Sequence, residues 1–204
     1  MSVVQSVFTA ALAGMVLAVG SGCDPPSRSA AFHGTEVTSP GPAHEISAPN
    51  WDGSTFQLAE HRGKVVLLAF GYTFCPDVCP FTLRRLAEVH EALGDDAKKT
   101  AVVFVTVDPE RDSIEKLKSY IPVFNGEFFG LRSAGEVMAA LLKGYGIKVT
   151  RQIPSTPGGY YAVDHTGDVF LIDKSGRLRL THPHDTTAED LLADVQALLR
   201  EASP

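Results

Sequence analysis

Two cysteines separated by three residues have the clearest chemical potential in this sequence. Cys75 and Cys79 lie in the segment FCPDVCP, residues 74–80. A disulfide between residues this close adds little stability, because the chain-entropy gain grows with the length of the closed loop. The pair therefore fits a chemical role better than a structural one, either thiol–disulfide exchange or the binding of a soft metal ion.

The spacing of the two cysteines is compatible with each of these roles. Redox thioredoxins have two residues between their cysteines, whereas this chain has three. The extra residue lets the sulfurs diverge enough to hold a metal ion and still form a disulfide. Thiolates are soft ligands that select Cu(I) over hard ions, although they also bind Zn²⁺. An inert disulfide, a redox pair and a metal site all stay open at this point.

The cysteine segment connects a predicted strand to a predicted helix. Residues 64–72 (KVVLLAFGY) form an apolar, β-branched run typical of a buried strand, and residues 81–93 carry apolar side chains at helical spacing. Pro80 fits the first turn of this helix, with Cys79 at or near its N-cap. Free N–H groups and the helix dipole favour a thiolate there, so we expect a lowered pKa for Cys79.

The rest of the chain continues the alternation of strands and helices. Residues 101–107 (AVVFVTV) predict a second buried strand. Residues 169–173 and 177–181 flank the turn Lys-Ser-Gly and predict a β-hairpin. Capping boxes predict three further helices that end near Tyr120, Lys143 and Glu201; the boxes pair Asp112 with Glu115, Ser133 with Glu136, and Thr186 with Glu189.

This order of elements predicts the fold class. It runs strand, helix, strand, helix, an insertion with a helix, then the hairpin and a terminal helix. We predict an α/β, thioredoxin-like fold, in which a central mixed β-sheet is flanked by helices and a β-hairpin lies near the C-terminus.

The N-terminus has the pattern of an export leader. Residues 7–19 form an apolar run, too short for a bilayer span of about 20 residues but suited to a signal peptide. Small residues precede Cys23, as in a lipoprotein cleavage site, so residues 1–23 are predicted to be a leader that leaves lipid on Cys23. An uncleaved anchor and simple cleavage near Gly22 are the alternatives. All three place the domain outside the cytoplasm.

Composition divides the remaining chain into a tether and a domain. Residues 24–44 are rich in Pro, Ser and Gly, which predicts a flexible tether, and residues 45–204 form one domain of ordinary size. The net charge is −6 and no Lys/Arg-rich run occurs, so nucleic acid is excluded as a partner. A soluble protein or a metal ion fits better.

Histidines are numerous, and periodicity singles out none of them. His182 and His184 follow the predicted hairpin, where we expect a loop or an adventitious metal site. His165 lies in VDHT, residues 163–166, in a predicted turn just before the strand at 169–173. The others are His33, His44, His61 and His90.

Three segments together resemble the Sco/SenC family of copper proteins. They are GYTFCPDVCP (71–80), VTVDPERD (105–112) and VDHTGDVFLID (163–173), in the order found in that family. The resemblance implies that Cys75, Cys79 and His165 bind one copper ion per domain. Two thiolates and one imidazole suit Cu(I), can also accept Cu(II), and leave one side open for transfer.

Two carboxylates lie next to these implied ligands in the sequence. Asp77 and Asp164 are candidates for orienting or screening the ligands. The alternative is that both are ordinary turn carboxylates.

The same resemblance implies a role in building the dinuclear copper centre of cytochrome c oxidase subunit II. The protein would take copper from a donor protein and deliver it, or would reduce the cysteines of subunit II. It would act as a metallochaperone at the periplasmic face of the inner membrane. The main alternative is an extracytoplasmic thiol–disulfide oxidoreductase without a physiological metal. A peroxidase, supported only by Thr82 and Arg84, and a purely structural interaction domain are weaker alternatives.

Overall fold

The computed structural model describes residues 32–152 and 160–202. The predicted leader, including Cys23, lies outside these residues. Among the helices in the described ranges, none combines the length and the apolar character needed to cross a membrane.

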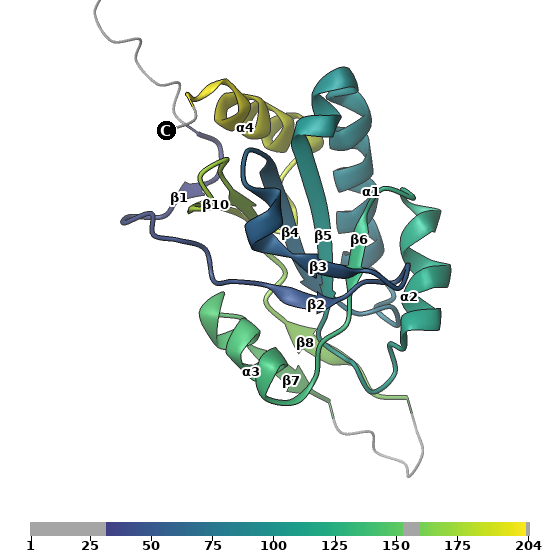
Figure 1. The fold of residues 1–204 in the computed structure, drawn as a ribbon. Helices are drawn as coiled ribbons and strands as arrows, with labels where there is room; N and C mark the ends of the chain where they lie inside the picture. Colours follow the sequence, from purple (N-terminus) through teal and green to yellow (C-terminus); the bar gives the residue numbers. More distant parts are fainter. Residues whose placement is uncertain (1–31, 153–159, 203–204) are drawn as a thin grey trace, which may run out of the picture. The chain divides into compact units, whose positions relative to one another are not determined.

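A six-stranded mixed sheet forms the centre of the domain (Figure 1). Two of its inner strands, β4 (Val65–Gly71) and β5 (Thr100–Thr106), are parallel and buried along their whole length. Their continuous apolar, β-branched sequences explain this, because both faces of the strands are covered. The strand order is β1-β10-β9-β4-β5-β6; the other strands are β1 (Thr35–Glu36), β10 (Leu178–His182), β9 (Val169–Ile172) and β6 (Phe129–Leu131), of which β1 and β6 form the edges.

Helices cover the sheet as the sequence pattern predicts. α1 (Val78–Ala92) and α4 (Ala188–Arg200) pack against each other behind the sheet in the view of Figure 1. After α3 (Gly135–Gly144), Tyr145 packs its ring against Phe70 of β4 and Phe170 of β9. The α/β, thioredoxin-like fold with a C-terminal hairpin is confirmed. The remaining helices are α2 (Ile114–Tyr120), α3 (Gly135–Gly144), and the 3₁₀ turns Leu58–His61, Gly94–Lys99 and Ile121–Val123.

The predicted capping boxes are wrong. Ser113, not Asp112, caps α2 by accepting a hydrogen bond from the Lys116 N–H, and Thr187, not Thr186, caps α4. The third box fails because α3 begins after Ala134 without a side-chain cap. Asp112 is fully buried, and its carboxylate is used by the core instead of by the helix.

The predicted tether is wrong for residues 32–44, which belong to the domain. Thr35 and Glu36 pair with β10, and the N–H groups of His33 and Gly34 donate to the Asp194 carboxylate at 3.0 and 2.8 Å. A two-residue edge strand leaves no apolar periodicity for sequence analysis to detect. Residues 24–31 lie outside the described residues, and for them the prediction stands untested.

Several short strands were also absent from the prediction. β2 (Ser47–Pro49) pairs with β3 (Thr55–Gln57), and β7 (Val149–Arg151) pairs with β8 (Val163–His165). The hairpin of β9 and β10 is confirmed, with Gly176 in its turn at φ 75°, a conformation that glycine adopts without steric strain.

Candidate metal centre

The cysteine pair lies where the parallel strands β4 and β5 end. The loop after Gly71 leads into α1, and both cysteines are free thiols. Cys75 is half-buried in the loop, whereas Cys79 is only 3% exposed as the second residue of α1. The backbone N–H of Cys79 donates to the Cys75 sulfur at 3.4 Å. The free N–H groups at the start of the helix therefore act on the loop cysteine.

The two thiols have opposite acidities. Hydrogen bonds from the Cys79 side chain and backbone lower the pKa of Cys75 to about 5, against the burial that opposes it. The hydrogen bond with Cys75, together with burial, raises the pKa of Cys79. The prediction of a lowered pKa at Cys79 is wrong, because the hydrogen bond with Cys75 and burial both favour the protonated thiol. Cys75 is the thiolate at neutral pH.

His165 approaches this pair from a distant part of the sequence. It is the last residue of β8, not part of a turn, and its Nε2 lies 3.5 Å from the Cys79 sulfur. Its Nδ1 lies 2.8 Å from the carbonyl oxygen of Thr166. A carbonyl oxygen only accepts, so Nδ1 carries a proton, and in the neutral imidazole Nε2 directs its lone pair at the sulfur. This is the tautomer that a metal-binding imidazole requires.

A pocket of about 370 Å³ opens beside the thiolate, and Cys75 and His165 both line it. The two candidate carboxylates, Asp77 and Asp164, lie at the same pocket and are exposed. His184 also lines the pocket, a position that its sequence context gave no reason to expect. Through this pocket a metal ion from solvent can reach Cys75 and His165, the two candidate residues that are not fully buried.

The donor set fits a soft metal ion, but the described residues do not form a closed site. Within residues 32–152 and 160–202, no three His, Cys, Asp or Glu side chains lie close enough together to hold a metal ion in the observed conformation. Cys79 and His165 are already adjacent, whereas the Cys75 sulfur is engaged by the Cys79 N–H. Two sulfurs and one neutral imidazole are ligands that select Cu(I) over hard ions.

The other predicted candidates lie elsewhere. His182 is the last residue of β10 and 1% exposed, with its Nε2 3.2 Å from the Asp194 carboxylate. It is therefore a core residue, and the expectation of a loop position is wrong. Burial lowers its pKa. Arg84, one of two residues behind the peroxidase alternative, is exposed on α1.

Comparison with known proteins gives the same family from sequence and from structure. The SCO1/SenC family model matches residues 44–200. The SCO2-like protein RP587 of Rickettsia prowazekii is 31% identical over 141 residues, which cover 69% of each chain. Copper-bound ScoI of Bradyrhizobium japonicum superposes with a TM-score of 0.70 at 32% identity, over 78% of this chain and 100% of that one. Apo Sco1 of Thermus thermophilus gives a TM-score of 0.74 at 37% identity, over 83% and 98%. This chain belongs to the SCO1/SenC family.

Proposed function

We propose that this protein is a copper metallochaperone that serves cytochrome c oxidase. It binds one copper ion through Cys75, Cys79 and His165 and delivers it to the dinuclear copper site of oxidase subunit II. The observation that carries the proposal is the 3.5 Å approach of the His165 Nε2 to the Cys79 sulfur, across 86 residues of sequence. Membership of the SCO1/SenC family supports it, as does the copper in the Bradyrhizobium relative.

Capture of the ion begins at Cys75. Its thiolate lines the pocket, so an incoming copper ion meets it first. Its sulfur then turns from the Cys79 N–H toward the pair formed by Cys79 and His165. Cys79 releases its proton as its sulfur binds the metal, since metal ligation requires the thiolate. In its neutral form, with the proton on Nδ1, His165 binds the metal through Nε2.

Release follows from the low coordination number. Three protein ligands leave one side of a copper ion open, and the pocket connects that side with solvent. Cysteines of the acceptor approach there and displace the ligands one at a time. Each displaced sulfur regains its hydrogen bond or its proton, which favours completion of the transfer.

A second function of the same residues is reduction of a disulfide in the acceptor. The low pKa of Cys75 favours it, because the thiolate is the nucleophile in disulfide exchange. Cys75 attacks the acceptor disulfide, forms a mixed disulfide and expels one acceptor thiolate. Cys79 then loses its proton and attacks the Cys75 sulfur, which releases the second acceptor thiolate. The acceptor gains two electrons, and this domain is left with a Cys75–Cys79 disulfide.

The location of the domain is part of the proposal. We infer an extracytoplasmic domain held at the periplasmic face of the inner membrane by lipid on Cys23. Mass spectrometry of the membrane-extracted protein tests this directly. A diacylglyceryl mass on an N-terminal Cys23 peptide is expected, and a peptide that retains the leader would instead indicate an uncleaved anchor.

Copper titration separates the two functions. The reduced domain is titrated with Cu(I) without oxygen, against a competing chelator, and compared with His165→Ala. We expect one copper ion per domain and retention at least about tenfold weaker in the variant. His61→Ala is the control, since its ring stacks on Phe56, away from the pocket residues. Equal retention by His165→Ala would contradict the metal site.

Reductase activity provides the complementary measurement. Cys75→Ser is expected to abolish reduction of a disulfide substrate, because it removes the attacking thiolate. His165→Ala is expected to retain that activity if reduction is an independent function of the thiol pair.

A further inference from the structure

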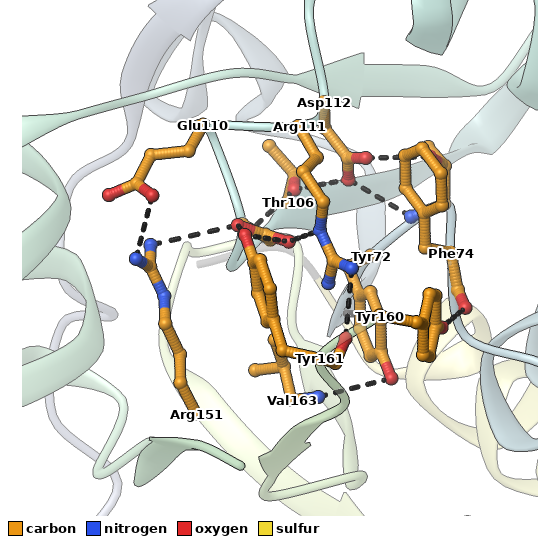
Figure 2. A network of polar contacts seen from close by, with 12 residues as sticks. Tyr72, Phe74, Thr106, Glu110, Arg111, Asp112, Arg151, Tyr160, Tyr161 and Val163 are labelled. Carbon is orange, nitrogen blue, oxygen red and sulfur yellow. Dashed lines mark hydrogen bonds and ion pairs between the residues drawn. The ribbon is translucent and has the colours of Figure 1, made fainter. Parts of the chain in front are cut away.

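Arg111 joins the segment that carries the cysteines to the segment that carries His165 (Figure 2). Its guanidinium carbon lies 3.6 Å from the centroid of the Tyr161 ring and 5.3 Å from that of Tyr160, both shortly before β8. The same carbon lies 4.9 Å from the centroid of the Phe74 ring and 5.6 Å from that of the Tyr72 ring, both in the loop after β4. One cation is thus surrounded by rings from both segments.

Hydrogen bonds fix the guanidinium in this place. Its Nε donates to the carboxylate of Asp108, which is fully buried, and its Nη1 donates to the carbonyl oxygen of Tyr161 at 2.9 Å. The Tyr161 hydroxyl donates to the same carboxylate at 3.0 Å. The buried Nη2 has no hydrogen-bond acceptor among the described residues, so for this group the aromatic faces are the favourable contact.

The two segments also contact each other directly. The Val163 N–H donates to the Tyr72 hydroxyl at 3.3 Å, and the Tyr160 hydroxyl donates to the carbonyl oxygen of Phe74. Phe74 immediately precedes Cys75, and Val163 lies two residues before the histidine. These contacts therefore set the position of the imidazole strand against the thiolate loop.

The segment that carries Arg111 is also hydrogen-bonded to the cysteine loop. The Asp112 carboxylate accepts from the Thr73 N–H at 2.9 Å, from the Thr73 hydroxyl at 2.6 Å and from the Thr106 hydroxyl at 2.6 Å. Residues 108–112 thus fix the loop through Asp112 and the β8 segment through Arg111.

We propose that Arg111 is a positioning residue that sets the distance between His165 and the cysteine pair, and so sets the affinity and geometry of copper binding. This inference rests on the proposed function. Arginine suits the position because its planar guanidinium stacks on rings while donating hydrogen bonds in its own plane, which a lysine ammonium cannot do. A lysine at this position keeps the positive charge beside Asp108 but cannot stack on the rings and donate the same hydrogen bonds.

The test compares Arg111→Lys with a matched control, Arg179→Lys. Arg179 also pairs with a buried aspartate, Asp173, and its side chain is 15% exposed against 17% for Arg111. Cu(I) affinity is measured by chelator competition, and Cu(II) binding by the thiolate-to-copper absorption band. Arg111→Lys is expected to bind copper about ten- to a hundredfold more weakly and to shift the band. Arg179→Lys is expected to match the parent in both measurements.

A measurement without metal separates this inference from the proposed function. The ¹⁵N chemical shifts of the His165 ring in the reduced, metal-free protein should change in Arg111→Lys and not in Arg179→Lys. Unchanged shifts, or a copper affinity and absorption band equal to those of the parent, would overturn the role of Arg111. Failure of the parent itself to bind copper would overturn the proposed function, and the ring shifts would still decide whether Arg111 positions His165.

Discussion

Two arginine–aspartate pairs at opposite ends of the sheet differ in what they connect. At the hairpin end, where Ile172 pairs with Val66 near the start of β4, Asp173 accepts bonds from Arg177 and Arg179. Both partners lie within six residues of it in the chain. At the other end, Arg111 reaches from Asp108 to a carbonyl oxygen fifty residues away. The first pair stabilises a turn that is formed locally. The second fixes segments that no local preference brings together.

Thiol reactivity should show the largest difference between the two ends. In Cys79→Ala, Cys75 loses its hydrogen bond from the Cys79 side chain, and its pKa rises from about 5 toward the ordinary 9.0. Alkylation by iodoacetamide at about pH 6 should then fall by more than about tenfold, because the thiolate is the reacting form. In the parent, the rate should decrease as the pH falls through about 5.

The control for this prediction is Arg179→Ala, which alters only the hairpin end. Its alkylation midpoint should equal that of the parent. A parent-like midpoint in Cys79→Ala would show that Cys79 does not stabilise the Cys75 thiolate.

Removing the carboxylate of either pair should lower stability, but only one of the two losses should also affect copper binding. Asp108→Ala leaves the mostly buried Arg111 guanidinium without its carboxylate, which costs about 3 kcal/mol in the free energy of unfolding. Asp173→Ala should cost less, because Arg179 keeps its ion pair with Glu201. Urea denaturation measures this loss. Only Asp108→Ala should also weaken copper binding. Equal weakening in both variants would mean that loss of stability, not position, controls the site.

The stability that Asp173 contributes at the hairpin end should be lost in acid. Burial alone would raise the pKa of Asp173, but hydrogen bonds from Arg177 and Arg179 outweigh it, and the pKa is lowered from 3.8. A lowered pKa in the folded state stabilises the protein above 3.8, and this contribution disappears as the pH falls through the folded-state pKa. The unfolding temperature of the parent should therefore fall more steeply below about pH 4 than the unfolding temperature of Asp173→Asn. Parallel curves would contradict this contribution.

The smallest effects should come from the helix caps. Ser113→Ala removes the cap of α2 beside the Arg111 segment, and Thr187→Ala removes the cap of α4. Each should lower the free energy of unfolding by about 1 kcal/mol. Both should retain parental copper affinity, since each hydroxyl accepts its hydrogen bond from the first turn of its own helix. A copper defect in Ser113→Ala alone would extend the positioning role to the start of α2.

Sequence patterns predicted the parts of this protein in which long segments obey one periodicity. The buried runs of β4 and β5, the apolar face of α4 and the turn of the hairpin each carry the signal over several residues. Strands of two or three residues carry no such signal, so β1, β6 and β8 were not predicted. The predicted cap of α2 was wrong by one residue. Asp112 and Ser113 are equally suitable caps in sequence, and only the burial of Asp112 distinguishes them.

The candidate site was predictable only in part. The cysteine spacing indicated chemistry, but His165 was selected by family resemblance, because its neighbour Cys79 lies 86 residues away in sequence. The opposite pKa shifts of the two cysteines follow from their hydrogen bonds with each other and from the burial of Cys79, which sequence patterns do not show. Nothing in the sequence around Arg111 indicated which rings would surround it.

The outer strands of the sheet have a consequence for the protein in a crowded compartment. β1 has two residues and β6 three, against seven in each central strand. Because β1 covers the outer side of β10, neighbouring copies find few free backbone groups on which to add a strand. Copies of the protein at high concentration are thereby protected from edge-to-edge aggregation.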